Sequence, residues 1–292
     1  MGLRLKFNLV MLLVAALGLT GIGFIASAVL QRNAREEILQ TAGLMMESAM
    51  AIRGYTVNQI RPLLSVQMTR EFLPQTVPAY AATQNIHGLR KRYPDYTYKE
   101  ATLNPTNPAS RATDWEAGIV EYFRNNKNAN ELIGEHTTPT GPSLYLARPI
   151  EVKSEGCLSC HGSVADAPPT MLARYGKANG FGWKMQEIVG SQIVSVPMSV
   201  SLARADKAFT TFMLAVGAVF AVIMLILNIL LHTIVIHPVK RMASIAHDVS
   251  MGKLDVAECT PTGKDEISVL AESFNRMRRS LVNAMQMLNT PQ

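Results

Sequence analysis

The chain is poor in the residues that mark several common classes of protein. It has three cysteines among 292 residues, too few for a scaffold held by disulfides. Charged residues make up 17% of the sequence, and the net charge of +6 is scattered. Because no dense Lys/Arg block interleaved with aromatic residues occurs, we do not expect nucleic acid as a partner. A catalytic constellation is also missing from the sequence, so we do not expect an enzyme.

Apolar residues are abundant instead, at 48% of the sequence, and two long runs contain many of them. Residues 7–30 form an uncharged run of 24 residues, and about 20 suffice to cross a bilayer as a helix. Ala26-Ser27-Ala28 resembles a cleavage site, so a cleaved secretory signal is the alternative. We favour an uncleaved anchor because the apolar core of a signal is usually about 7–15 residues long. The second run covers residues 208–236 and predicts a second span.

The most informative motif is Cys157-Leu158-Ser159-Cys160-His161, a C-x-x-C-H sequence. Two thiols at this spacing can each add across a vinyl group of one haem, and His161 then follows in position to ligate the iron. The alternative is a redox-active or zinc-binding cysteine pair with an incidental histidine. A structural zinc normally takes four protein ligands, and the remaining cysteine, Cys259, lies beyond the second apolar run. We therefore expect one covalent haem c.

Between the two runs, helical periodicity and strand alternation both occur, which predicts an α+β domain. The expected elements are a helix over 31–64, a strand over 96–103, a helix opened by the capping box Thr113-x-x-Glu116, a strand over 144–152, and a hairpin that turns at Gly190-Ser191.

Heptads follow the second run. Two sets of apolar residues step by three and four along the chain: Val239, Met242, Ala246 and Val249, and then Ile267, Leu270, Phe274, Met277 and Leu281. Such spacing places each set along one seam, as a parallel coiled coil requires. Gly252, Pro261 and Gly263 separate the two helices. Because two helices per chain complete a four-helix bundle only when two chains associate, we expect a homodimer; an ordinary amphipathic hairpin is the alternative.

The heptad segment resembles a HAMP domain, the relay module of bacterial transmembrane receptors, over about residues 237–285. The motifs that carry this resemblance are Pro238, Gly252-Lys253-Leu254-Asp255, Asp265-Glu266-Ile267 and Phe274-Asn275-Arg276-Met277.

The middle of the chain, over about residues 40–200, resembles the haem-c-binding PAS-like sensor domains of bacterial kinases and chemoreceptors. Its motifs are Asn104-Pro105-Thr106-Asn107-Pro108, Arg111 through Trp115-Glu116, the C-x-x-C-H sequence and Asn179-Gly180-Phe181-Gly182-Trp183. The resemblance implies a PAS-like antiparallel sheet with a long N-terminal helix, and a haem c held against the sheet.

The resemblance leaves the second axial ligand of the iron open. In part of the family a Cys or Met of the N-terminal segment supplies it, and this chain has no cysteine there. The candidates are an exchangeable water, an open position, or one of Met45, Met46, Met50, Met68, His87 and His136. Our hypothesis is Met50, which lies one helical turn from Met46 with Arg53 nearly on the same face. Arg53 and Arg111 are the candidates for binding the haem propionates, with solvated surface charge as the alternative for both.

Four parts are therefore expected. Residues 1–30 form a cytoplasmic tip and the first transmembrane helix, 31–207 the haem-c sensor domain, 208–236 the second transmembrane helix, and 237–289 the HAMP domain. Haem c is attached outside the cytoplasm, so we expect the sensor domain in the periplasm and the HAMP domain in the cytoplasm of a bacterial inner-membrane protein. The Lys and Arg residues that flank the spans are balanced and do not decide the orientation.

The leading hypothesis is a membrane-bound sensor of redox state or of a diatomic gas, which signals through its HAMP domain. Its output is expected from a separate cytoplasmic kinase or chemotaxis-type partner, because no kinase, cyclase or methyl-accepting segment follows residues 237–289. The alternative is a membrane-anchored c-type cytochrome that transfers electrons.

Overall fold

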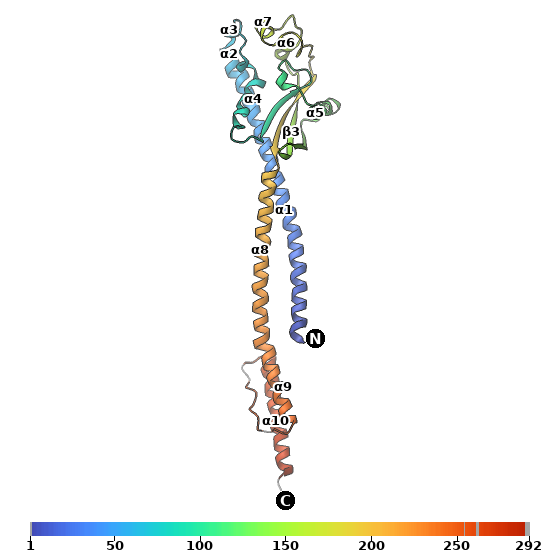
Figure 1. Cartoon of the computed structure of the whole chain (residues 1–292), viewed down its shortest axis with the longest axis vertical. Coiled ribbons are helices and arrows are strands. Elements are labelled where there is room, and N and C mark those ends of the chain that lie inside the picture. The colour runs from blue at the N-terminus through green and yellow to red at the C-terminus, as the bar shows by residue number, and fades with distance from the viewer. Residues whose placement is uncertain (1, 254, 261–262, 290–292) are drawn as a thin grey trace. The chain divides into compact units, whose positions relative to one another are not determined.

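The computed structural model describes residues 2–253, 255–260 and 263–289 of the chain (Figure 1). Leu254 and Pro261, two of the residues quoted for the relay segment, lie outside these ranges. The contacts divide the chain into one unit of residues 26–209 and another formed by 1–25 with 210–292. Each unit is described by itself.

The helices of the chain are α1 (Leu3–Tyr55), α2 (Arg61–Leu63), α3 (Ser65–Met68), α4 (Pro78–Leu89), α5 (Asp114–Asn125), α6 (Glu155–His161), α7 (Pro169–Tyr175), α8 (Ser199–Leu230), α9 (His237–Ser250) and α10 (Glu266–Asn289). Two π-helical segments, η1 (Thr56–Ile60) and η4 (Leu231–Ile236), and two short 3-10 segments, η2 (Pro74–Thr76) and η3 (Pro108–Ser110), complete the helical part. The strands are β1 (Thr97–Thr102), β2 (Leu132–Thr138), β3 (Gly141–Glu151) and β4 (Ile188–Pro197).

The unit of residues 26–209 is built on a four-stranded antiparallel sheet in the order β1-β4-β3-β2 (Figure 1). Long helices accompany the sheet, which confirms the α+β class. In the register of the central strands, Val194 of β4 lies opposite Tyr98 of β1 and Leu146 of β3. Because side chains alternate along a strand, these three residues share one face of the sheet.

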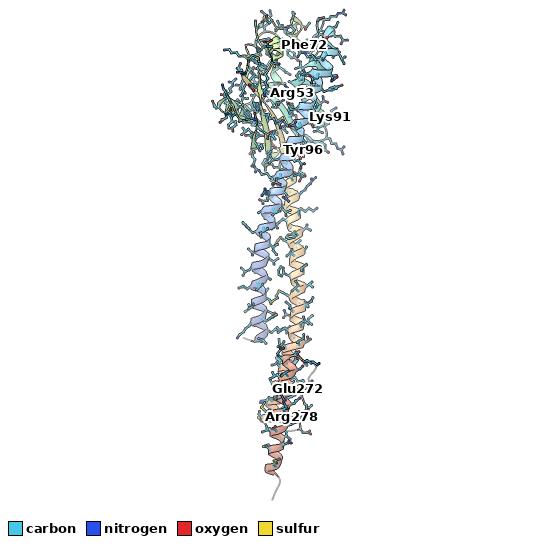
Figure 2. The ribbon with its side chains drawn as sticks, turned by 180° about the vertical axis from the view of Figure 1, so that it is seen from behind. Arg53, Phe72, Lys91, Tyr96, Glu272 and Arg278 are labelled. Carbon is cyan, nitrogen blue, oxygen red and sulfur yellow. The ribbon has the colours of Figure 1, made fainter. Side chains whose placement is uncertain are left out.

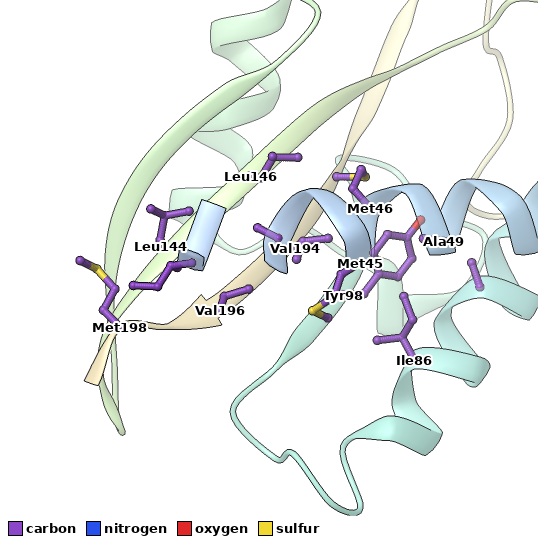
Figure 3. Close-up of a cluster of buried hydrophobic side chains, with 13 residues drawn as sticks. Met45, Met46, Ala49, Ile86, Tyr98, Leu144, Leu146, Val194, Val196 and Met198 are labelled. Carbon is purple, nitrogen blue, oxygen red and sulfur yellow. The ribbon is translucent and has the colours of Figure 1, made fainter. Parts of the chain in front are cut away.

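Helix α1 covers that face and forms the larger core of this unit (Figure 3). Its buried residues follow helical spacing: Ile38, Ala42, Met45, Met46 and Ala49. They pack with Ala82 and Ile86 of α4 and with Tyr98, Leu144, Leu146, Val194, Val196 and Met198. Burying one large apolar side chain stabilises a fold by about 1.5–3 kcal/mol, so this cluster fixes α1 on the sheet.

Helix α5 covers the opposite face. Its residues Ile119 and Phe123 pack against Ala101, Ala147 and Ile193 of three neighbouring strands. The predicted capping box is confirmed: the Thr113 N–H donates to the Glu116 carboxylate at 2.8 Å, and the reciprocal bond is also present. Two layers of helices therefore enclose the sheet, with α1 on one side and α5 on the other.

The hairpin predicted at Gly190-Ser191 is wrong, because these residues lie inside the continuous strand β4. Gly190 is opposite Thr102 of β1 and Ile150 of β3. A Cβ at this position would collide with the Ala101 carbonyl oxygen and lie 3.1 Å from Thr102 Oγ1. A glycine within a strand often marks such a close approach of two backbones. The apolar runs on either side form one strand, and the predicted strands over 96–103 and 144–152 are confirmed as β1 and β3.

Two helical stretches of the chain, Leu3–Leu63 and Ser199–Ser250, are long and apolar enough to span a membrane. In the second unit, large apolar side chains such as Leu9, Phe24, Leu214 and Leu225 are exposed. Contact with the lipid of a membrane would remove these apolar side chains from water. Within this unit, a Cβ added to Gly18 would lie 3.6 Å from the Phe220 ring, and a Cβ added to Gly23 would lie 3.4 Å from the Met213 side chain. The apolar stretches of α1 and α8 therefore approach each other closely.

The same unit ends in α9 and α10, with a connector between them. Met242 of α9, Cys259 of the connector and Ala271 of α10 form a small buried cluster, against which Phe274 packs. Asn275 clamps the connector: its side chain accepts from the Cys259 N–H at 3.0 Å and donates to the Cys259 carbonyl at 2.6 Å. The predicted helix, connector and helix over 237–289 are therefore present.

Candidate functional site

The C-x-x-C-H motif forms the short helix α6. Helical spacing places Cys157 and Cys160 on one side of it, and both thiols are partly exposed. The helix ends directly after His161 at Gly162, whose N–H donates to the Leu158 carbonyl at 2.8 Å. A Cβ on Gly162 would lie 2.7 Å from that oxygen. The motif thus presents two accessible thiols and a histidine from a single turn.

Three groups fix the orientation of the His161 ring. Its Nδ1 lies 2.7 Å from the Gly180 carbonyl oxygen and 3.4 Å from Thr106 Oγ1, and the ring stacks on Trp183 with centroids 3.9 Å apart and planes 12° from parallel. A carbonyl only accepts hydrogen bonds, so Nδ1 carries the proton and Nε2 carries the lone pair. Burial lowers the pKa of His161, and the bond to Gly180 partly offsets this effect. The imidazole is therefore neutral near pH 7, with Nε2 ready to bind a metal.

Two segments that are far apart in the sequence meet at His161. Gly180 has a φ of +85°, and a Cβ there would overlap Thr106 Oγ1 and lie 2.7 Å from the Thr106 nitrogen. The Gly182 N–H donates to the Gly162 carbonyl at 2.7 Å, and the Trp183 N–H donates to the His161 carbonyl at 3.1 Å. Both loops quoted from the sequence, residues 104–108 and 179–183, thus hold the histidine.

An apolar wall stands beside the cysteines. Phe72, Ala167 and Met171 are buried together, with Cys160 packed against them. The Phe72 ring, labelled in Figure 2, meets Tyr175 edge to face at 5.7 Å. Paired thiols, a neutral imidazole with a free Nε2, and an apolar wall together form a donor set that fits a covalently attached haem.

Arg53, a predicted propionate ligand, lies near the C-terminal end of α1 and is labelled in Figure 2. It pairs with Glu100 of β1, whose side chain is almost fully buried. Burial opposes the charge of Arg53, but Glu100, together with Tyr98 and Cys157, raises its pKa overall. Arg111, the other predicted propionate ligand, is exposed directly after η3.

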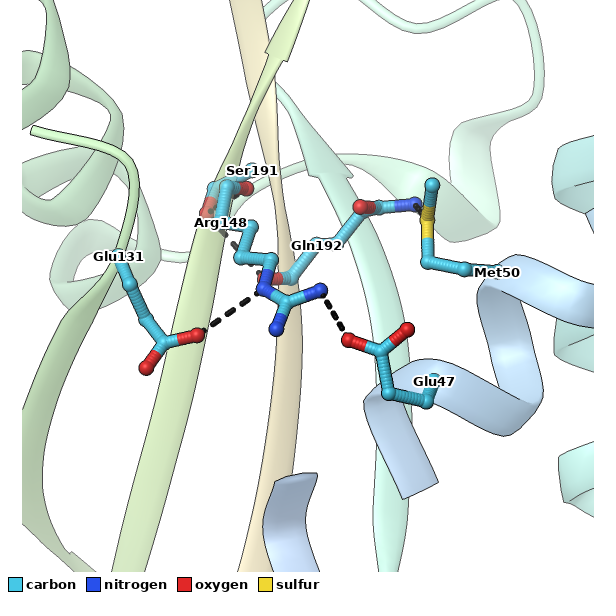
Figure 4. A network of polar contacts seen from close by, with 6 residues as sticks. All are labelled: Glu47, Met50, Glu131, Arg148, Ser191 and Gln192. Carbon is cyan, nitrogen blue, oxygen red and sulfur yellow. Dashed lines mark hydrogen bonds and ion pairs between the residues drawn. The ribbon is translucent and has the colours of Figure 1, made fainter. Parts of the chain in front are cut away.

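Met50 lies on the face of α1 that meets the sheet, one turn before Arg53. Its Sδ accepts a hydrogen bond from Gln192 Nε2 at 3.3 Å (Figure 4). Gln192 belongs to β4 and is buried. The same close-up shows Arg148 of β3, which bonds Glu47 of α1 at 2.8 Å. Polar contacts therefore join α1 to the sheet beyond the apolar core.

The other candidates for the second axial ligand are spread over the domain. Met45 and Met46 fill the apolar core under α1. His136 of β2 stacks on Trp115 at 4.1 Å, on the face of the sheet that α5 covers. His87 is exposed on α4, and Met68 lies at the end of α3.

Two families match this chain. A model described as Tll0287-like covers residues 31–197, more than half of the sequence. The chain belongs to the Tll0287-like family. This is a haem-binding, PAS-like sensor family, and a HAMP domain model matches residues 230–283 of the same chain. In a Tll0287-like protein with a HAMP domain and two helices that could span a membrane, these parts point to signalling at a membrane rather than to catalysis.

Among solved structures, the chain is similar to the crystal structure of the cyanobacterial heme-protein Tll0287. The two are 17% identical, with a TM-score of 0.43, and the similarity covers 55% of this chain and 95% of the other. Nothing matches in the comparison with curated proteins.

Several residues that shape the site of this Tll0287-like domain were missed as site residues in the sequence. Thr106, Gly180 and Trp183 stood in the quoted motifs, but nothing in the sequence indicated that they contact His161. Glu100 and Gln192 carried a weak signal, since a carboxylate and an amide inside predicted strands are polar where apolar residues are usual. Their partners on α1 became apparent only from the fold.

Proposed function

We propose that this protein is a membrane-bound haem-c sensor that relays the state of its haem through the HAMP domain. The observation that carries the proposal is the fixed His161 ring beside two accessible thiols on α6. Cys157 and Cys160 would hold the haem covalently, and His161 Nε2 would ligate its iron. A bound haem supplies an iron whose charge and ligation change with redox state or with a diatomic ligand.

Two of the residues proposed to serve the haem belong to α1. Arg53 and Met50 lie on α1 and contact the sheet through Glu100 and Gln192. Arg53 would also neutralise nearby propionate charge, and Met50 or a small ligand would complete the coordination of the iron. Arg111 is the second candidate for a propionate. A change at the haem would therefore alter the contacts that hold α1 on the sheet.

We further propose that residues 1–30 and 208–236 are the two transmembrane parts, with 31–207 in the periplasm and 237–289 in the cytoplasm of a bacterial inner-membrane protein. The exposed apolar side chains of the second unit support the two spans. Haem c is attached outside the cytoplasm, which supports the orientation. The output would pass to a separate cytoplasmic kinase or chemotaxis-type partner from a homodimeric HAMP bundle.

The first test is whether haem is covalently attached. The full chain, produced with the haem c maturation machinery and then denatured, should stain for haem. Changing both Cys157 and Cys160 to Ala should abolish the staining. Cys259→Ser is the matched control, because this thiol is buried in the other unit and the staining should persist. A wild-type chain without covalent haem refutes the cofactor assignment.

The second test is whether the haem signals. Met277 is exposed on α10, and Met277→Cys in a Cys259→Ser background reports the proximity of two chains. We expect reduction of the haem to change the rate of cross-linking, and His161→Ala to remove that change while the dimer remains. A rate that is independent of the state of the haem favours the electron-transfer cytochrome instead.

A further inference from the structure

One side of α1 faces outward from the unit of residues 26–209. Along this side, five residues recur at steps of three and four: Thr41, Leu44, Ser48, Ala51 and Tyr55. Thr41 is half-buried, and the other four are exposed, Leu44 by 64% and Tyr55 by 60%. We refer to these five residues as the α1 stripe. Their spacing places them along one seam, as in a coiled coil.

The hydroxyl groups of the α1 stripe are already hydrogen-bonded within their own helix. Thr41 Oγ1 donates to the Glu37 carbonyl at 2.9 Å, and Ser48 Oγ donates to the Leu44 carbonyl at 2.7 Å. Covering a polar group costs free energy mainly when the group loses its hydrogen bonds to water without replacement. Because these two donors keep their acceptors, a partner can cover the stripe at little cost.

The α1 stripe is also uncharged. Two charged residues occur on α1 between positions 41 and 55, and both are engaged with the sheet. Glu47 bonds Arg148 at 2.8 Å, and Arg53 pairs with Glu100. Like charges that meet across an interface oppose association. The stripe therefore allows the approach of an identical surface.

An open groove of about 600 Å³ borders the C-terminal end of the stripe, between α1 and α4. Ala51 and Tyr55 line it from α1, and Tyr80 and Gln84 line it from α4. All of the described residues that line this groove are uncharged. The exposed, uncharged surface thus continues from the stripe onto α4.

We propose that the α1 stripe is the surface through which the sensor domains of two copies of this chain pair, with their α1 helices parallel and in register. The partner is a second copy because the seam of α10 also needs one: Leu270 and Met277 are exposed in the single chain. The inference therefore rests on the homodimer of the proposed function. Helix α1 also carries the first apolar stretch, so two chains in one membrane hold their copies of α1 in the same direction. In a parallel pair, each residue meets its own copy.

The size of the stripe favours such a tethered partner over a free protein. Only Leu44 and Tyr55 are large, whereas specific complexes between free proteins bury roughly 1,200–2,000 Å². Two chains that are already joined elsewhere present their stripes to each other at a high effective concentration, so a small seam suffices. The Tyr55 ring lies at the edge of this seam beside the groove, where its hydroxyl keeps its contact with water.

The test forms disulfides in the full, haem-loaded chain in a membrane, in a Cys259→Ser background. Leu44→Cys, Ser48→Cys and Ala51→Cys should each give a disulfide-linked dimer on mild oxidation. Tyr122→Cys is the control, because Tyr122 is exposed on α5 at the opposite side of the sheet, and this variant should remain monomeric. Equal cross-linking at Tyr122 and on the stripe would reflect random collision and overturns the inference.

A pair of charge variants tests direct contact between the two copies of residue 48. Ser48→Glu places like charges opposite each other across the seam and should suppress the cross-linking of Ala51→Cys. Ser48→Lys should have the same effect. Co-expression of one chain of each kind should restore the cross-link between them, because opposite charges then meet. A loss that co-expression does not restore comes from damage to α1 itself and counts against the interface.

Met277→Cys on α10 distinguishes the two ways in which the inference can fail. A chain that cross-links at Met277 but not on the α1 stripe is a HAMP dimer whose stripe faces a different partner or solvent. That result overturns this inference alone. A chain that cross-links at neither position is monomeric, which overturns the homodimer of the proposed function as well.

Discussion

His161 Nδ1 lies 2.7 Å from the Gly180 carbonyl oxygen, in a loop that only glycine allows to approach Thr106. A histidine that donates from one nitrogen to a carbonyl is a more basic metal ligand through the other nitrogen. The residues around His161 would therefore set both the direction and the strength of a bond from its Nε2 to a haem iron.

Gly180→Ala should disturb this contact. The new Cβ would overlap Thr106, and the φ of +85° is strained for alanine. Loss of the bond weakens the histidine as a ligand for ferric iron, so the midpoint potential should rise by tens of millivolts, given about 59 mV per factor of ten. Spectroelectrochemical titration measures it.

Gly176→Ala is the matched control for that substitution. Gly176 has a similar φ of +79°, but an added Cβ meets nothing within 4 Å. Both variants should lose some stability through backbone strain, whereas only Gly180→Ala should move the potential. Equal potentials in the two variants would show that the Gly180 carbonyl does not tune the histidine.

The pair of Arg53 and Glu100 gives a prediction about stability. Removing Arg53 leaves a buried carboxylate without its cation, which usually costs about 3–5 kcal/mol. Arg53→Met should therefore lower the free energy of unfolding strongly. The double variant Arg53→Met with Glu100→Leu should recover much of the loss, because no charge stays buried. Thermal unfolding in detergent measures both, and additive losses would contradict the predicted coupling.

The sequence predicted the elements whose signals are local. The Thr113-x-x-Glu116 capping box needs only neighbouring residues, and α5 begins where that pattern places it. The helical spacing of Ile38, Ala42 and Ala49 likewise follows from the single buried side of α1. Such features follow from periodicity, because one side of each helix faces an apolar core.

The sequence failed where the deciding contact comes from a distant strand. Gly190 looked like a turn residue, but the backbone of β1 approaches it inside β4. The contact of Gln192 with Met50 joins residues 142 positions apart. Neither periodicity nor turn chemistry carries such information. The C-x-x-C-H motif at Cys157 could therefore be recognised in the sequence, whereas the residues that surround the site could not be predicted from it.

Tyr98 gives a prediction about pH. Burial, together with the neighbouring Glu100 carboxylate, raises the pKa of its hydroxyl. The folded chain keeps Tyr98 neutral where the unfolded chain ionises it. Its contribution to stability is therefore full below about pH 10 and is lost as the pH rises further. The free energy of unfolding should fall less steeply above about pH 10 in Tyr98→Phe than in wild type. Tyr55→Phe is the control, because Tyr55 is 60% exposed, and its slope should equal that of wild type.

The connector of the HAMP domain depends on Asn275. Its side chain makes two hydrogen bonds to the backbone of Cys259, and that thiol is 4% exposed. Asn275→Ala leaves both backbone groups without these partners, at a cost of about 1–3 kcal/mol for a buried group. The Cys259 thiol should then react much faster with a maleimide. Asn283→Ala, on an exposed position of the same helix, should leave the rate unchanged; an equal rise in both variants would assign the effect to the helix as a whole.

The last prediction tests whether the two ends of the molecule are coupled. On α10, Phe274 packs within its own chain, whereas Leu270 and Met277 are 52% and 64% exposed. A second chain would cover these residues in a parallel bundle. Coupling between two sites is reciprocal. If the haem biases this bundle, then a disulfide that locks the bundle must change the midpoint potential of the haem.

That disulfide can be formed at Met277→Cys in a Cys259→Ser background. A coupling of about 1–3 kcal/mol corresponds to a shift of tens of millivolts, since about 59 mV is a factor of ten for one electron. The potential is measured before and after oxidation of the pair, and again after its reduction by a thiol. Asn283→Cys lies about 120° around α10 from Met277, at 3.6 residues per turn, and so away from the seam. It is the control and should not cross-link within a parallel dimer. A haem that titrates identically with the bundle locked or free has no coupling to it, and the protein would then be an electron carrier rather than a sensor.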